Sequence, residues 1–299
     1  MRTGDYYDRL FLLLHLFTTN YFSYLLGQLS CIHGPVLTNI TGSSIIVNLK
    51  PMNTIYDRIG INYSGTRQAD PRISAQIYSK LKDAKRIINI GAGTGSYEPD
   101  DMDLVAVEPS SEMIAQRSSK AHPVVKGFAE KLPFEKNSFS HAMTVLSMHH
   151  WENKDQAFRE INRVVSESFV AVTWNPEAEP FWLTRDYFPE IYEKDKKTFS
   201  KKDELDKYFD DLEVSKLMIP EDCKDGFLAA FWKRPKAYLN DKVRKSISAF
   251  AKLNDCSTGL QKLQSDLDNG AWMDKNRDIL DASFLDVGYI VVSAKVKNP

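Results

Sequence analysis

The sequence predicts an α/β fold with an open, mostly parallel sheet that is covered by helices on both faces. The first observation is a series of short, continuous apolar runs, which are typical of strands buried on both faces. The second is that patterns with helical periodicity lie between several of these runs, and such alternation implies right-handed strand–helix–strand units. The runs are Arg86–Ile90, Leu104–Val107, Val124–Val125, Ala142–Leu146 and Phe169–Val172.

Two helices have clear start signals. Asp70 is followed by proline, which is a typical N-cap and first helical position, and apolar residues then recur at every fourth position as far as Leu81. Asn153 with Gln156 resembles a capping box, and a buried stripe of apolar residues follows it. We therefore expect one helix before the first apolar run and another between the fourth and the fifth.

The pattern after Trp174 is looser. We expect helices at residues 181–192 and 201–212, and a strand at residues 212–219. A mostly helical segment is expected at residues 221–280 because large apolar residues recur through it, and a final strand at residues 284–297. This order predicts a helical insertion between the last two strands.

Charge is spread unevenly along the 299 residues. Five of the first 51 residues are charged, against 74 of the remaining 248. The apolar run Leu10–Leu26 is interrupted by polar residues and is at the short edge of spanning length, and no net positive charge precedes it. We expect residues 1–51 to be an extension outside the fold, from an upstream over-assignment of the start, with the fold beginning at Met52. A weak membrane anchor is the alternative.

Composition excludes several classes of protein. The formal net charge is −1, whereas a dedicated nucleic-acid-binding protein has a clear basic excess or stripe. The three cysteines, Cys31, Cys223 and Cys256, are too far apart for a disulfide framework or a CxxC zinc pair. We expect reduced thiols and a cytoplasmic location, and the oligomeric state stays open.

The segment IINIGAGTGSY at residues 87–97 carries the chemistry. An apolar strand that runs into Gly91, Gly93 and Gly95 predicts a turn at the carboxyl end of a central strand, where a ligand can lie against the backbone. Glu108 ends the next strand, and a carboxylate there can accept hydrogen bonds from both hydroxyls of a ribose.

Four motifs in this order and spacing, GAGTG, VEPS, AEKLPF and VLSMHHW, resemble those of class I S-adenosylmethionine-dependent methyltransferases with a type-11 methyltransferase domain. The resemblance covers residues 52–175 and is closest to a branch with GAG-x-GSYEP and VAVEPS. It implies a Rossmann-like fold with a seven-stranded sheet at residues 52–299. Residues 52–85 then form an N-terminal lid and helix, residues 86–220 the cofactor-binding core, and residues 221–280 a cap.

The same resemblance implies S-adenosylmethionine as the cofactor. It assigns Gly91, Gly93 and Gly95 to the methionine and ribose part, Glu108 and Pro109 to the ribose, Phe128, Ala129 and Glu130 to the adenine, Val145 and Leu146 to the wall beneath the sulfonium, and Tyr63 and Arg67 to a covering segment. Arg67 suits the methionine carboxylate because its fork binds a carboxylate with two hydrogen bonds.

The chain departs from the family pattern in three places. The acid usual two residues before the first glycine is Asn89, and the acid usual before the adenine-loop alanine is Phe128. Only residues 97–102 separate the glycine loop from the next strand, so the usual helix is shortened to about a turn. Asn89 remains a candidate contact through its amide.

The expected activity is in-line methyl transfer to a small molecule, without a nucleic-acid or membrane partner. His149 and His150 are candidate bases or substrate contacts, because they follow the fourth apolar run. We expect no metal, since adjacent histidines without carboxylates make a poor site. One alternative is a cofactor-binding protein without transferase activity. Another is an NAD-dependent oxidoreductase, although Ser96 replaces the third glycine of that fingerprint.

Overall fold

The computed structural model describes residues 37–38, 44–45, 65 and 67–297, and the chain divides into two compact units, residues 1–52 and 53–299. In the first unit the described residues form an antiparallel pair, β1 (Leu37–Thr38) and β2 (Ser44–Ile45). The run Leu10–Leu26 lies outside the described residues, and the placement of residues 1–51 outside the fold stays a prediction. None of the helices that the structure describes is long and apolar enough to span a bilayer.

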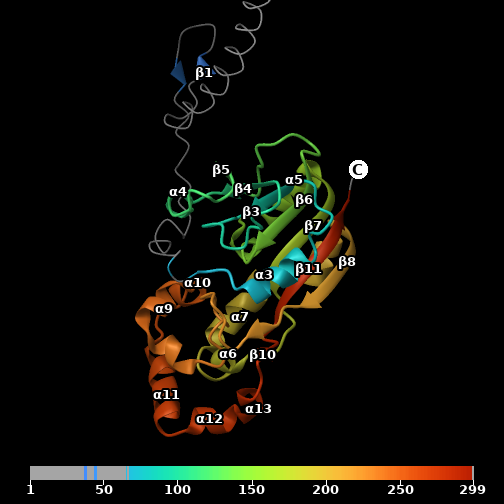
Figure 1. Ribbon diagram of the computed structural model, residues 1–299. Helices are drawn as coiled ribbons and strands as arrows, with labels where there is room; N and C mark the ends of the chain where they lie inside the picture. The colour runs from blue at the N-terminus through green and yellow to red at the C-terminus, as the bar shows by residue number, and fades with distance from the viewer. Residues whose placement is uncertain (1–36, 39–43, 46–64, 66, 298–299) are drawn as a thin grey trace, which may run out of the picture. The chain divides into compact units, whose positions relative to one another are not determined.

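The second unit is built on a seven-stranded sheet in the order β5-β4-β3-β6-β7-β11-β8 (Figure 1). The five strands from β5 to β7 pair in parallel, and β11 is antiparallel to both of its neighbours. This confirms the predicted mostly parallel seven-stranded sheet. The strands are β3 (Ile87–Ile90), β4 (Leu104–Glu108), β5 (Val124–Lys126), β6 (Phe139–Val145), β7 (Val165–Trp174), β8 (Phe209–Lys216) and β11 (Tyr289–Val296).

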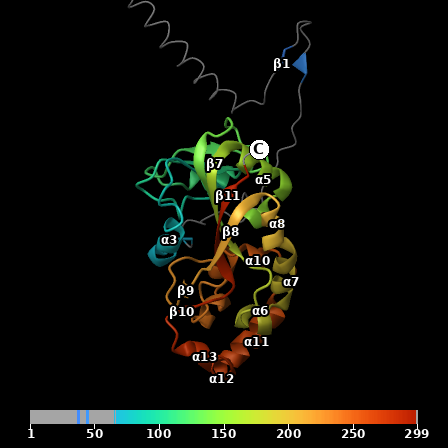
Figure 2. The same cartoon turned by 90° about the vertical axis from the view of Figure 1, so that its right-hand side faces the viewer.

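Helices cover both faces of this sheet. Figure 2 shows α3 (Pro71–Tyr78) on one side and α5 (Lys154–Val164) with α8 (Lys202–Asp206) on the other. Ile87 packs in the apolar cluster that contains α3, whereas Ile88 packs in the cluster that contains α5. Successive strand residues point to opposite faces, so the continuous apolar run of β3 supplies both layers. A short helix, α4 (Ser111–Ala115), follows β4.

The predicted start of α3 is confirmed. The Asp70 side chain accepts a hydrogen bond from the Arg72 backbone N–H at 2.9 Å, and Pro71 is the first helical residue. Asp70 is buried and also binds the Arg72 guanidinium and the Lys224 backbone N–H. It therefore joins the helix to the segment that follows β9 (Ile219–Pro220). Leu81 is buried but lies beyond the helix end.

A helical layer lies at one end of the sheet, where a third apolar cluster contains Trp182, Leu263 and Trp272 (Figure 1). We call residues 235–280 the cap. Two helices that follow β7, α6 and α7, pack in the same cluster. The elements are α6 (Trp182–Asp186), α7 (Pro189–Thr198), the 3₁₀ helix η3 (Pro235–Leu239), α9 (Asp241–Lys245), α10 (Ser248–Ala251), α11 (Ser257–Asp268), α12 (Ala271–Lys275) and α13 (Arg277–Leu280).

Several expected boundaries were wrong. The expected helix at residues 201–212 ends at Asp206, and the expected strand at residues 212–219 is β8, which begins at Phe209. Pairing with β11 sets this start, because Phe209 is buried opposite Val296. Residues 221–234 form turns, so the helical part of the expected insertion begins only at Pro235. The expected strand at residues 284–297 is divided, because β10 (Phe284–Leu285) pairs separately with β9.

Replacement of Asp70 by alanine should destabilise the fold by about 2–4 kcal/mol, because it removes an N-cap and the buried carboxylate that also binds the Lys224 backbone N–H and the partly exposed Arg72 guanidinium. Burial alone raises the pKa of Asp70, but hydrogen bonds from Arg72 and Lys224 outweigh it and lower the pKa to about 2. The stabilisation is therefore present above about pH 4 and is lost as the pH falls towards 2. Urea unfolding at pH 7 and pH 3 measures both effects.

Asp222→Ala is the matched control, since this exposed carboxylate binds the same guanidinium from the solvent side. It should leave the unfolding midpoint nearly unchanged at pH 7. Equal effects of the two substitutions would show that the Asp70 N-cap adds no stability beyond that of an exposed ion pair.

Candidate active site

The glycine loop follows β3 directly. Gly91, Gly93 and Gly95 have φ values of +69°, +55° and +86°, which favour glycine. A Cβ atom on Gly91 would lie 1.8 Å from the Ser147 Oγ. The loop therefore packs tightly against the segment that follows β6, and the absent side chain serves this contact as well as access for a ligand.

Glu108 holds the loop from the neighbouring strand. Its carboxylate, buried in the structure, accepts the Gly93 backbone N–H at 2.8 Å and the Ser110 N–H at 2.9 Å, one on each oxygen. Pro109, between Glu108 and Ser110 in the sequence, is partly buried. These two hydrogen bonds fix the Glu108 carboxylate beside the glycine loop, at the carboxyl end of β4.

A buried carboxylate also lies beside Asn89, where the family pattern has an acid. The Asn89 amide donates to Glu98 Oε1 at 3.1 Å, and the Arg117 guanidinium binds Glu98 Oε2 at 2.6 Å. Arg117 also donates to the Gly93 carbonyl oxygen. Residues 91–103 contain no helix, so the shortening is greater than the sequence predicted. The Asn89 Oδ1 atom is buried without a hydrogen-bond partner among the described residues.

The adenine-loop candidates have different environments. Ala129 is buried, and Phe128 is partly buried and bridges to Lys131. Glu130 Oε1 accepts the backbone N–H groups of Glu152 and Asn153 at 2.9 and 3.2 Å. Glu130 thus fixes the start of α5, and the predicted adenine roles of these residues stay predictions.

The segment after β6 is strained and aromatic. Val145 ends the strand, and Leu146 has a φ of +51°, which is rare for a branched side chain. His149 and His150 follow in the 3₁₀ helix η2 (Met148–His150). The His149 ring stacks on Phe199 with ring centres 4.4 Å apart, and it lies 3.8 Å from the His150 ring.

Both imidazoles are held neutral. Burial lowers the pKa of His149 well below its usual value, and His150 and Lys252 add to this. Burial, with Lys252 and Arg67, lowers the pKa of His150 to about 3. His149 Nδ1 is buried without a hydrogen-bond partner among the described residues. At neutral pH these rings can orient or accept hydrogen bonds, but they are weak bases.

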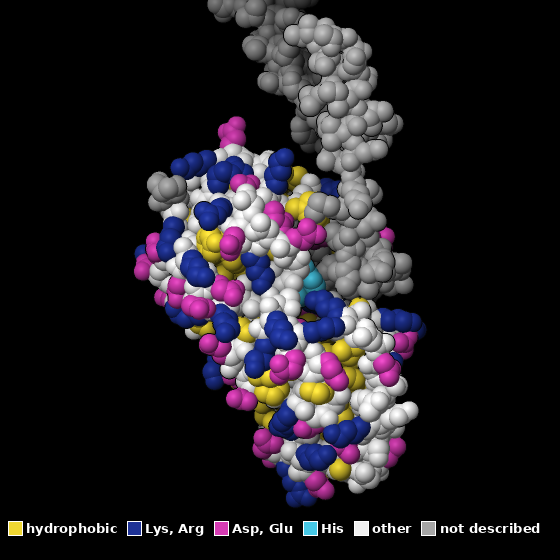
Figure 3. All heavy atoms as spheres, turned by 180° about the vertical axis from the view of Figure 1, so that it is seen from behind, with side chains coloured by type: hydrophobic (Ala, Val, Ile, Leu, Met, Phe, Trp, Pro, Cys, Tyr) yellow, Lys and Arg dark blue, Asp and Glu magenta, His cyan; other side chains and the backbone are white. Residues whose placement is uncertain are grey.

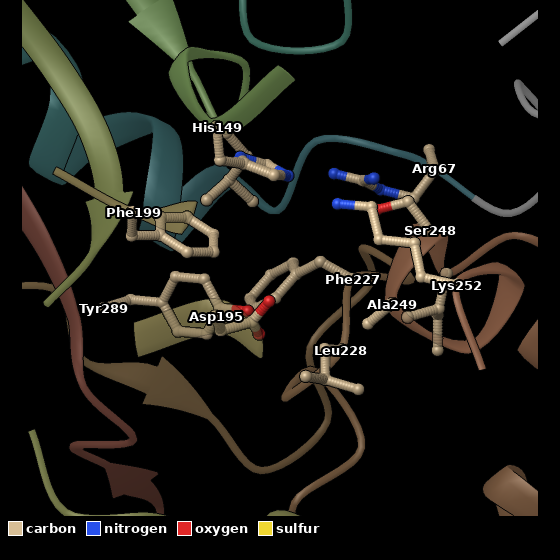
Figure 4. A pocket seen from close by; sticks show the side chains of 12 residues that line it. Arg67, His149, Asp195, Phe199, Phe227, Leu228, Ser248, Ala249, Lys252 and Tyr289 are labelled. Carbon is tan, nitrogen blue, oxygen red and sulfur yellow. The ribbon is translucent and has the colours of Figure 1, made fainter. Parts of the chain in front are cut away.

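A pocket opens beneath His149 (Figure 4). Its lining combines Leu146, the residue after β6, with residues of the cap and of α7, so the cap borders the pocket. The lining residues are Arg67, Leu146, His149, Asp195, Phe199, Phe227, Leu228, Ile247, Ser248, Ala249, Lys252 and Tyr289. On the face in Figure 3, histidine side chains emerge beside Lys and Arg side chains, and charges of both signs are interspersed elsewhere.

Arg67 borders this pocket but has a protein partner. Its guanidinium binds the two oxygens of Asp225 at 2.6 and 3.3 Å, and the Tyr97 hydroxyl donates to the same carboxylate at 2.9 Å. The predicted pairing of Arg67 with the methionine carboxylate stays a prediction. Tyr63 lies outside the described residues.

Sequence reasoning missed the two other charged groups of the pocket. Asp195 comes from α7 and Lys252 from the residue after α10. Both stand in charged or mixed stretches that gave no motif. Burial raises the pKa of Asp195 to about 6, although the Lys252 ammonium acts in the opposite direction. Burial likewise lowers the pKa of Lys252.

Asp195→Asn should stabilise the fold by roughly 1–3 kcal/mol at pH 8, because the folded state binds the proton of Asp195 more tightly than the unfolded state does. The gain should be fully present above about pH 6, should shrink as the pH falls from 6 to 4, and should vanish only towards about pH 3, where the carboxyl is neutral in both states. Urea unfolding of both proteins between about pH 3 and pH 8 measures this. The exposed Asp281→Asn is the control and should show no such dependence.

Comparison with known sequences and structures finds methyltransferases. Residues 88–169 match the family model of a methyltransferase domain. A crystal structure of a putative methyltransferase from an antibiotic biosynthesis pathway of Anabaena variabilis is 31% identical, with a TM-score of 0.69 over 76% of this chain and 98% of that one.

Two curated relatives match shorter segments. A rice chloroplastic 2-methyl-6-phytyl-1,4-hydroquinone methyltransferase is 25% identical over 47% of this chain and 43% of its own length. An uncharacterized protein of Methanocaldococcus jannaschii is 32% identical over 32% of this chain and 39% of its own. The chain thus spans less than half the length of these two relatives. The structural match at 31% identity, which covers 98% of the Anabaena protein, and the family-model match show that the chain belongs to the class I S-adenosylmethionine-dependent methyltransferases.

Proposed function

We propose that the protein transfers the methyl group of S-adenosylmethionine to a small-molecule acceptor held in the pocket beneath His149. The observation that carries the proposal is the contact between the two halves of the site. The glycine loop packs against Ser147, and the next residues of that segment, with the cap, line the pocket. A donor on the loop and an acceptor in the pocket are then neighbours.

The loop fits the cofactor on three counts. Gly91 and Gly93 carry no side chains of their own, the buried Glu108 carboxylate at the end of β4 stands where a ribose would lie, and the unpartnered Asn89 Oδ1 offers an acceptor for an ammonium group. When bound there, the cofactor supplies a methyl group activated by a positively charged sulfur. We assign Val145 and Leu146 to the adjacent wall and Phe128 with Ala129 to the adenine side.

The protein's main contribution is alignment. Holding two reactants in line can lower a barrier by about 7–11 kcal/mol. Rigid elements border the site on the sheet side, because Leu146 is fixed by the Val172 carbonyl oxygen and His149 is stacked on Phe199. We assign His149 a role in orienting the acceptor rather than in removing its proton, since its imidazole is held neutral by burial.

The choice of a small acceptor rests on the charge balance and on the pocket, which is lined by side chains from the segment after β6, from α7 and from the cap. On the face in Figure 3 charges of both signs are interspersed, and the formal net charge of −1 differs from the basic excess of a nucleic-acid-binding protein. Cys223 and Cys256 are free thiols, which supports a reducing, cytoplasmic location.

Calorimetric binding of S-adenosylmethionine, S-adenosylhomocysteine and NADH to the full chain tests the proposal. The two adenosyl ligands should bind and NADH should not. Glu108→Ala should weaken both by about tenfold or more, because a hydrogen bond to a charged group contributes about 1.5–3 kcal/mol. The control Glu112→Ala, in the first turn of α4, should bind like the wild type.

Binding of NADH alone would overturn the methyltransferase assignment in favour of an oxidoreductase. Binding of the adenosyl ligands without release of S-adenosylhomocysteine from a broad panel of small acceptors would favour a cofactor-binding protein without transferase activity.

A further inference from the structure

Two opposite charges in the pocket have no protein partner. Among residues 65 and 67–297, the Asp195 carboxylate forms no hydrogen bond or ion pair, and neither does the Lys252 ammonium. The other carboxylates buried around the site, Glu98, Glu108 and Asp225, all carry hydrogen bonds from the protein. Partly buried charges without partners are costly, so their retention in one pocket indicates a ligand.

The two groups enter the pocket from different walls. Figure 4 shows the Asp195 side chain beside Tyr289, and the Lys252 side chain reaching in from the cap below Arg67. They do not form an ion pair with each other, so a ligand that pairs both must present two polar groups at separate positions. Besides Lys252, the ionisable group that faces Asp195 is the Tyr289 hydroxyl from β11, and burial raises the pKa of that hydroxyl.

The rest of the lining suits a planar body. The His149 and Phe199 rings are stacked with 21° between their planes, and the Phe227 and Tyr289 rings meet edge to face at 5.0 Å. Leucine and isoleucine side chains complete the apolar surface. Aromatic rings pack well against such offset and edge-on neighbours.

We propose, building on the methyltransferase function above, that Asp195 and Lys252 determine the acceptor: a small aromatic molecule that donates a hydrogen bond from a hydroxyl or amine to Asp195 and presents a carboxylate or similar anion to Lys252. Arg67 is already balanced by Asp225, so this arrangement pairs the two remaining charges of the pocket. A ligand with only one of the two groups leaves one charge unpaired, and the pocket discriminates against it for that reason.

The test uses the full chain saturated with S-adenosylhomocysteine, and calorimetry with three probes: 4-hydroxybenzoate, benzoate and phenol. The wild type should bind 4-hydroxybenzoate about tenfold or more tightly than either probe that lacks one polar group. Asp195→Asn should abolish the advantage over benzoate, and Lys252→Met the advantage over phenol. Glu193→Gln, on the exposed face of α7, and Lys245→Met, on the surface of α9, are the matched controls and should retain both advantages.

Equal affinity of the wild type for the three probes would overturn the proposal, and so would variants that weaken all three probes alike. Binding of S-adenosylhomocysteine is recorded for every variant, which separates this proposal from the function. Failure of the wild type to bind it would contradict the methyltransferase function, and the same probe selectivities, measured in the cofactor-free protein, would then decide on the pocket.

Discussion

The glycine loop is the constraint on which the site depends, because no helix follows it to hold it in place. Two buried carboxylates do this instead. Glu108 reaches from β4 to the Gly93 backbone, and Glu98 is clamped between Asn89 and Arg117. Both carboxylates are buried and accept charge-assisted hydrogen bonds, which are stronger than bonds between neutral groups. The loop can therefore keep three glycines with positive φ and still present a fixed surface to a ligand.

This arrangement explains the departure at position 89. An aspartate there would lie against Glu98, and two carboxylates at hydrogen-bond distance repel each other. Asparagine donates to Glu98 and keeps one oxygen for another donor. The negative charge is thus moved from the end of β3 to the loop, where Arg117 compensates it.

Contiguous patterns predicted most of the fold, because each element that they describe is set by local periodicity. The apolar runs gave the five parallel strands, and Asp70 with Pro71 gave the start of α3. The start of β8 could not be found in this way, since pairing with β11 outweighs the helical pattern around Leu205. The cofactor loop was readable for the same reason as the strands, as its parts are adjacent in sequence.

The acceptor pocket was not readable, because its parts come together only in the folded chain. Asp195 and Lys252 are separated by more than fifty residues and stand in stretches whose other charges are exposed. Solvated and functional charges look alike in a sequence, and only the loss of water distinguishes them. The pKa of Asp195 is raised because burial removes water from its carboxylate. When a ligand supplies the missing partners of buried charges, the protein is less stable without that ligand. The unpaired charges that destabilise the empty protein therefore also give the pocket its selectivity.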